Sequence, residues 1–186
     1  MDRSKTCRLC GGNKMRIVLH LEPTPSGDAY VSKEKAKEAQ PLYPLDLVLC
    51  QECGHSQLSE VVDPELLYSN YIYTTSISLG LADHFAKYVD AVLAYAKPAK
   101  GSLVVDIGSN DGTLLKAFKN KELQVLGVDP APTAARKANE SGIETINSYF
   151  TAKLSGKIKK ERGSAAIITA NNVFANIDDL EDIMIG

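Results

Sequence analysis

Two patterns of apolar positions alternate along the second half of the chain. From residue 102 onward, short apolar runs alternate with segments whose apolar residues recur every three or four positions. The runs are typical of buried strands, and the spaced pattern is typical of amphipathic helices. Strands are predicted at 103–107, 124–128, 143–147 and 165–170, and helices at 112–119, 131–141 and 151–161, with another helix beginning at Asp178-Asp179. Strands that alternate with helices build a parallel sheet, so we expect an α/β fold.

The first hundred residues follow a different plan. Short strands are expected near 16–21 and 45–49, and the sequence Asp63-Pro64-Glu65 predicts a helix start with proline just inside an acidic cap. Apolar residues at helical spacing predict an amphipathic helix that follows a tyrosine-rich segment and ends before Pro98. We therefore expect a small module over 1–62, a linker with this helix over 63–100, and the α/β domain over 101–186.

The four cysteines form two Cys-x-x-Cys pairs, Cys7 with Cys10 and Cys50 with Cys53, and glycine follows each pair. Two such turns point four thiolates at one centre, which completes a tetrahedral Zn²⁺ site. Four thiolates leave no open position for water or substrate, so the predicted zinc is structural. An iron site with the same ligands stays open as an alternative. His55 is interpreted as a surface or packing residue rather than a fifth ligand.

Composition and charge exclude some classes of function. The formal net charge is −2, which gives no electrostatic reason to expect a nucleic acid or a membrane surface as partner. The polar N-terminus does not resemble a signal peptide, and the sequence has no apolar run of the length, about 18 residues, that spans a membrane. A cytoplasmic location is the expectation, and reducing conditions there disfavour structural disulfides.

The loop after the first strand of the α/β region indicates which nucleotide it would hold. Dinucleotide-binding loops read G-x-G-x-x-G, whereas this loop reads Asp106-x-Gly108-x-Asn110-x-Gly112. That pattern resembles motif I of class I S-adenosylmethionine (SAM) methyltransferases. SAM carries an ammonium but no phosphate, so its loop needs a nearby acid and backbone room for a carboxylate. An ordinary βα turn is the alternative, and it loses weight because Asp129 ends the next predicted strand, where a carboxylate would face two ribose hydroxyls.

Several motifs occur in one order along the chain. They are the cysteine pairs, PLYPLDLVLCQECGHSQL at 41–58, YSNYIYTTSIS at 68–78, the DIGSNDG loop, GVDPA at 127–131 and ANNVFANI at 170–177. Together they resemble the nucleotide-sugar C-methyltransferase family over nearly all of the chain. The resemblance implies an N-terminal zinc-binding domain, a Rossmann-like class I SAM domain and a C-terminal domain. The family's sheet has more strands than the roughly four expected here, so we expect this chain to be the N-terminal part of a longer enzyme.

The resemblance also implies roles for individual residues. The residues implied to bind the cofactor are Asp106, Gly108, Ser109, Asn110, Gly112, Asp129, Phe150, Asn171 and Asn172. Those implied to form the lip of the sugar-nucleotide site are Tyr71, Tyr73 and Ser76. Phe150 is interpreted equally well as an ordinary core residue, and His84 equally well as a structural one.

The family reaction implied by the resemblance transfers a methyl group to a carbon of a nucleotide-linked keto-deoxysugar in deoxysugar biosynthesis. A base removes a proton next to the ketone, and the resulting enolate attacks the SAM methyl. The base is expected downstream of this chain, so we assign no catalytic residue and expect the chain alone to bind SAM poorly and to be inactive. An unpaired sheet edge would also favour self-association.

Two alternatives come from other classes of function. One is an RNA or protein methyltransferase that reads its substrate with the zinc module, which would favour a basic face that the slightly acidic chain lacks. The other is a non-catalytic, zinc-stapled scaffold that retains half of a nucleotide-binding fold for assembly. A SAM titration separates the scaffold from the two enzymes.

Overall fold

The computed structural model describes residues 2–3, 5–27, 30–68 and 71–186. It forms two compact units, Met1–Tyr68 with Asp178–Leu180 and Ser69–Ile177 with Glu181–Gly186. Within the described residues, no helix has both the length and the apolar character that a membrane crossing requires. Ser69 and Asn70 of the tyrosine-rich motif lie outside the described residues.

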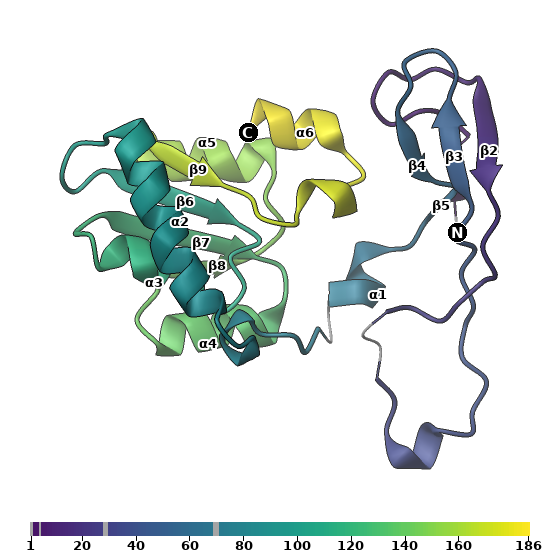
Figure 1. Cartoon of the computed structure of the whole chain (residues 1–186), viewed down its shortest axis with the longest axis horizontal. Coiled ribbons are helices and arrows are strands. Elements are labelled where there is room, and N and C mark those ends of the chain that lie inside the picture. The colour runs from purple at the N-terminus through teal and green to yellow at the C-terminus, as the bar shows by residue number, and fades with distance from the viewer. Residues whose placement is uncertain (1, 4, 28–29, 69–70) are drawn as a thin grey trace. The chain divides into compact units, whose positions relative to one another are not determined.

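The first unit is built on a small antiparallel sheet (Figure 1). Its strands, in spatial order, are β2 (Met15–Leu19), β3 (Leu47–Cys50) and β4 (Ser56–Leu58). A separate two-residue pairing joins β1 (Asp2–Arg3) to β5 (Glu60–Val61), and a 3₁₀ turn spans Lys33–Lys35. Helix α1 (Pro64–Tyr68) begins where expected, with the Asp63 carboxylate accepting the Glu65 amide at 2.9 Å.

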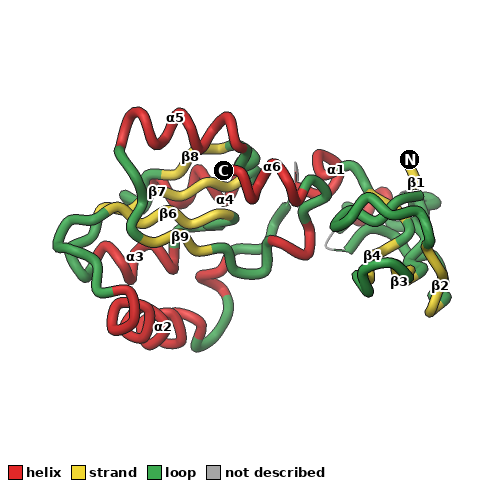
Figure 2. The backbone as a smooth tube through the Cα atoms, turned by 90° about the horizontal axis from the view of Figure 1, so that it is seen from above, coloured by secondary structure: helices red, strands yellow, loops and turns green. Residues whose placement is uncertain are grey.

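The second unit is a four-stranded parallel sheet in the order β8-β7-β6-β9 (Figure 2). The strands are β6 (Leu103–Ile107), β7 (Gln124–Asp129), β8 (Thr145–Asn147) and β9 (Ile167–Thr169). The chain moves outward from β6 to β8 and then crosses back to place β9 on the other side of β6. This reversal puts the carboxyl ends of β6 and β9 beside a topological switch point, where open α/β sheets bind ligands.

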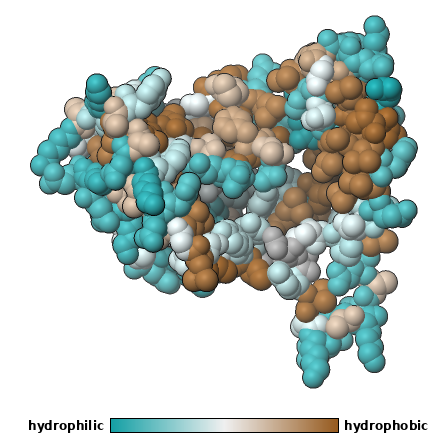
Figure 3. Space-filling model, in the orientation of Figure 1, coloured by the Kyte–Doolittle hydropathy of each residue, from teal (hydrophilic) through white to brown (hydrophobic). Residues whose placement is uncertain are grey.

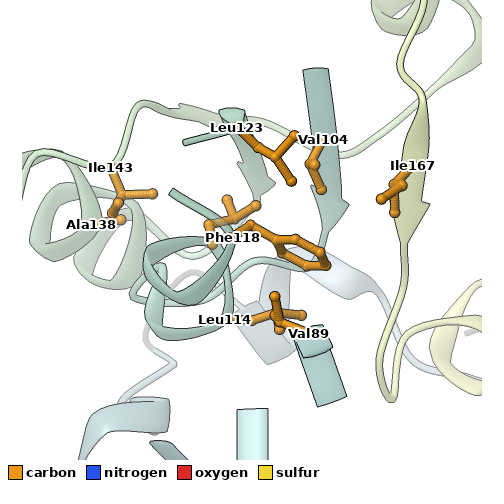
Figure 4. Close-up of a cluster of buried hydrophobic side chains, with 9 residues drawn as sticks. Val89, Val104, Leu114, Phe118, Leu123, Ala138, Ile143 and Ile167 are labelled. Carbon is orange, nitrogen blue, oxygen red and sulfur yellow. The ribbon is translucent and has the colours of Figure 1, made fainter. Parts of the chain in front are cut away.

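Helices cover both faces of this sheet. They are α2 (Leu81–Ala96), α3 (Thr113–Lys119), α4 (Pro132–Glu140), α5 (Ala152–Arg162) and the short α6 (Leu180–Ile185). Successive residues of β6 point to opposite faces. Val104 therefore packs in a cluster with Phe118 of α3, which extends toward Val104 and Val89 in Figure 4, whereas Val105 packs in a second cluster with Ile158 of α5.

The expected α/β class is confirmed. Every strand and helix expected from residue 102 onward is present, with ends that differ by a few residues, and the amphipathic helix before it is α2. The pattern did not predict β1, β4 and β5, nor the 3₁₀ turns at Thr75–Ile77 and Phe174–Asn176. The strands β1, β4 and β5 contain at most one apolar residue each, so no apolar run marks them in the sequence.

Candidate metal centre and cofactor site

The four cysteines come together in the first unit. Their Sγ atoms all lie within 4.8 Å of one another. Two separations are 3.6 Å, between Cys7 and Cys53, and 3.7 Å, between Cys10 and Cys50. A tetrahedron with Zn–S bonds of about 2.3 Å has sulfur atoms about 3.8 Å apart. The donor set and its spacing therefore fit a Zn²⁺ ion with four thiolate ligands.

The two Cys-x-x-Cys turns share one backbone geometry. The Gly11 amide donates to the Cys7 carbonyl at 2.8 Å, and the Gly54 amide donates to the Cys50 carbonyl at 2.9 Å. Both glycines have φ in the left-handed region, at 72° and 79°, where other residues are strained. The glycine after each pair thus allows the turn that aims both thiols at a common centre, as the sequence predicts.

The apolar core of the first unit is too small to stabilise it alone. Among its described residues, Cys7, Val48 and Cys50 are the buried apolar ones, whereas Ile17 and Leu19 of β2 are 45% and 48% exposed. Figure 3 shows apolar surface, in brown, over this sheet. Small domains with little core are usually stabilised by disulfides or metals. The metal is therefore expected to contribute folding energy rather than chemistry.

Two carboxylates lie at the carboxyl edge of the parallel sheet. Asp106 is in β6 and Asp129 ends β7, and both are buried. The Thr169 hydroxyl of the neighbouring strand β9 donates to Asp106 Oδ1 at 2.6 Å. Burial raises the pKa of Asp106 to about 7, and the Thr169 hydrogen bond only partly opposes this. A cationic ligand group at this edge would restore the charged form of Asp106.

Two backbone amides fix the position of the Asp129 carboxylate. Its Oδ2 accepts the Asn110 amide at 2.7 Å, and its Oδ1 accepts the Ala131 amide at 2.8 Å. A carboxylate oxygen can accept about two hydrogen bonds, and each Asp129 oxygen accepts one from the residues that the structure describes. Burial raises the pKa of Asp129, and the two backbone amides partly offset that rise. Neighbouring hydroxyls of a ribose match this arrangement of acceptors.

Two glycines of the loop after β6 are required by close packing and backbone conformation. Gly108 has φ of 70°, and its amide donates to the Val128 carbonyl at 2.8 Å. A Cβ at residue 108 would lie 2.5 Å from Cγ2 of Val173, and one at Gly112 would lie 2.8 Å from Cγ2 of Ile143. Close packing therefore requires both glycines, in addition to any ligand. Between them, the buried Ser109 Oγ has no hydrogen-bond partner among the described residues.

The residues predicted to bind the cofactor lie in three places, namely in the loop after β9, against the second core cluster and around the loop after β6. Asn171 and Asn172 follow β9 in an exposed loop, and Asn172 has φ of 55°. Phe150 is half-buried against the second core cluster, beside Leu154. An adenine contact by Phe150 stays a prediction, as does each of the roles that the resemblance implies. The structure brings Asp106, Gly108, Ser109, Asn110, Gly112 and Asp129 together around one loop.

The predicted lip residues lie beside that loop. The Tyr71 and Tyr73 rings are edge to face at 6.3 Å, and the Tyr73 hydroxyl lies 2.8 Å from Ser78 Oγ. The Ser76 amide donates to Asp111 Oδ2 at 2.8 Å. Asp111 was missed as a site residue, although it stands in the same DIGSNDG motif. Burial would raise its pKa, but hydrogen bonds from Thr113 and Ser76 outweigh burial and lower it.

The sequence analysis also did not select Thr169, because the sequence marks it only weakly. A polar residue near the end of an apolar strand indicates a ligand site or a buried hydrogen bond, and the sequence does not show which. A separate hollow of about 390 Å³ lies at the opposite edge of the sheet, against Leu103 and Gln124, where β6 and β7 begin. The assignment of a site at the carboxyl edge therefore depends on the side chains found there and not on the presence of this hollow.

Two family models match the chain. Residues 7–68 match a model described as "Putative zinc binding domain", and residues 81–184 match a methyltransferase domain. The chain is 33% identical over 180 residues to the C-methyltransferase NovU of Streptomyces niveus. The alignment covers 97% of this chain and 43% of NovU. The chain thus spans less than half the length of this curated relative.

Similar solved structures are also methyltransferases. One is described as a "Putative methyltransferase from antibiotic biosynthesis pathway" of Anabaena variabilis ATCC 29413. It has 26% identity and a TM-score of 0.31, and the match covers 34% of this chain and 26% of that one. Another is the plantazolicin methyltransferase BpumL in complex with SAH, at 16% identity and a TM-score of 0.40. That match covers 51% of this chain and 36% of that one.

Proposed function

We propose that this chain, which belongs to the methyltransferase-domain family and also matches the "Putative zinc binding domain" model, serves in SAM-dependent C-methylation of a nucleotide-linked keto-deoxysugar. Its similarity to the C-methyltransferase NovU supports the proposal. The observation that carries the proposal is the carboxyl edge of the sheet. There, each Asp129 oxygen accepts only one hydrogen bond from the described residues, and Asp106 lies buried nearby in the adjacent strand.

Each part of the loop has a task in this proposal. Asp106 would take the ammonium of the methionyl group, because a cation beside a buried carboxyl favours its ionised form. Asp129 would accept hydrogen bonds from the two ribose hydroxyls. The left-handed backbone at Gly108 would leave the loop's amides open to the methionyl carboxylate.

SAM supplies an electrophilic methyl group when it is bound. In the proposed reaction a base removes the proton next to the ketone of the sugar, and the enolate carbon forms the new C–C bond as the methyl C–S bond breaks. The family resemblance assigns that base to a segment outside these residues. Tyr71, Tyr73 and Ser76 are proposed to border the sugar-nucleotide site, since their segment contacts the loop at Asn110 and Asp111.

A calorimetric titration of SAM tests the donor site. We expect weak but measurable binding by the wild-type chain, and a further ten- to a hundredfold loss, roughly, in Asp129→Asn, because a charged acceptor contributes about 1.5–3 kcal/mol. The matched control is Asp90→Asn in α2, which removes an exposed carboxylate that lies 2.6 Å from the Lys121 ammonium. Loss of binding in Asp90→Asn as well, or no binding by the wild type, would contradict the proposal.

A further inference from the structure

Residues 110 and 111 use their side chains away from the donor site. Asn110 Oδ1 accepts the Thr75 amide at 2.8 Å, and Asn110 Nδ2 donates to the Tyr73 carbonyl at 3.1 Å. Asp111 Oδ2 accepts the Ser76 amide at 2.8 Å. The loop after β6 therefore binds three consecutive peptide groups of the Tyr73–Ser76 segment, which lies 35 to 37 residues earlier in the chain.

The backbone at residue 110 makes this use of a side chain informative. Asn110 has φ of 50°, a conformation that glycine adopts at no steric cost. A glycine would satisfy the turn and would also fit the common spelling of motif I. The asparagine adds a side chain whose donor and acceptor are both used. Its own amide meanwhile donates to Asp129 Oδ2 at 2.7 Å. Asn110 therefore joins the Asp129 carboxylate, which is proposed to bind the ribose, to the Tyr73–Ser76 segment.

The segment has few other backbone partners. Its 3₁₀ turn at Thr75–Ile77 has no side-chain cap from Thr74, and its internal bonds run from the Ile77 amide to the Thr74 carbonyl and from the Ser78 amide to the Thr75 carbonyl. Those bonds leave the Thr75 and Ser76 amides to the loop. Thr74 is 2% exposed, whereas Thr75 is half-buried and Ser76 is exposed. The loop therefore holds the segment at the point where its chain passes from the interior to the surface.

We infer that Asn110 and Asp111 are positioning residues, which fasten the Tyr73–Ser76 segment to the donor loop so that the lip of the acceptor site and the ribose-binding edge form one unit. The inference rests on the proposed function for the identity of the two ligands. The Asn110 side chain holds the backbone of Tyr73 and Thr75, and the Asn110 amide binds Asp129 in the proposed donor site.

Amide hydrogen exchange of the full chain, read by NMR, tests the fastening without any ligand. Asn110→Gly keeps the left-handed turn and removes the side chain, so exchange at the Thr75 amide should become at least about tenfold faster. Asn110→Asp keeps an acceptor for Thr75 and should restore slow exchange there. The control is Lys97→Gly, which replaces another left-handed residue, with φ of 46°, at the end of α2.

A SAM titration of the same proteins tests the coupling. At SAM concentrations that saturate each protein in the calorimetric titration, the Tyr73 ring resonances should shift in the wild type and in Lys97→Gly and should not shift in Asn110→Gly. Unchanged exchange at Thr75 in Asn110→Gly, or a full Tyr73 response in that variant, would overturn the inference. A wild-type chain that binds no SAM would instead overturn the proposed function, and the exchange rates alone would then decide the fastening.

Discussion

Replacement of Gly112 by alanine tests how far packing, rather than the cofactor, requires this glycine. Gly112 precedes α3 with φ of 77° and ψ of 12°, and Gly80 precedes α2 with φ of 78° and ψ of −6°. Alanine in this region costs about 1–2 kcal/mol at either position. The gain from a less flexible unfolded chain, about 0.4–1 kcal/mol, is also common to both. The two substitutions differ in what the new methyl group meets.

At Gly80 the added Cβ has nothing within 4 Å, whereas at Gly112 it lies 2.8 Å from Cγ2 and 2.9 Å from Cβ of Ile143. Ile143 is 2% exposed, and its Cβ is fixed to the backbone, so it has no space to withdraw. Overpacking of this kind costs about 1–3 kcal/mol. We therefore expect Gly112→Ala to lower the free energy of unfolding by about 1–3 kcal/mol more than Gly80→Ala does.

Urea unfolding followed by helical circular dichroism, with zinc in the buffer, measures this difference. A lower midpoint at unchanged slope is the expected result for both variants. Equal losses in the two variants would refute the packing argument. In that case the glycine would be required only by its backbone conformation or by its ligand.

Three further results are expected. Burial raises the pKa of Asp106 from its ordinary value of 3.8 to about 7, so the native state keeps a proton that the unfolded chain loses. The free energy of unfolding should therefore fall by at most about 1.4 kcal/mol per pH unit as the pH rises from about 4 to 7. Urea unfolding of Asp106→Asn should show no such fall. Thr169→Val removes the hydroxyl that Asp106 Oδ1 accepts and should cost about 1–3 kcal/mol in the same assay, whereas Thr169→Ser should cost less. Cys50→Ser, or a chelator, should remove zinc in elemental analysis and make residues 5–68 sensitive to protease, because their core is small; a variant that stays resistant would contradict a structural metal.

The sequence was informative wherever the physical cause is local. Apolar runs and helical spacing predicted the α/β class, because a strand or helix that faces a core must show its period. The paired Cys-x-x-Cys turns predicted a metal centre, since the geometry of each turn depends only on its own cysteines and the glycine that follows them. The order of acidic and small residues from Asp106 to Gly112 predicted a loop for SAM rather than for a dinucleotide.

The tertiary structure decided which groups meet. Asp106 and Thr169 are 63 residues apart, and Asn110 and Thr75 are 35 apart, yet each pair shares a hydrogen bond. No periodicity reports such contacts, because they depend on strand order and on where a crossover returns. The sequence by itself determined the strands of the parallel sheet, the four cysteines that could hold a metal ion and the loop after β6. Only the fold determined that Asp106 is buried enough to hold its proton and that the loop's asparagine faces the tyrosine segment, because burial and long-range partners arise when distant segments pack together.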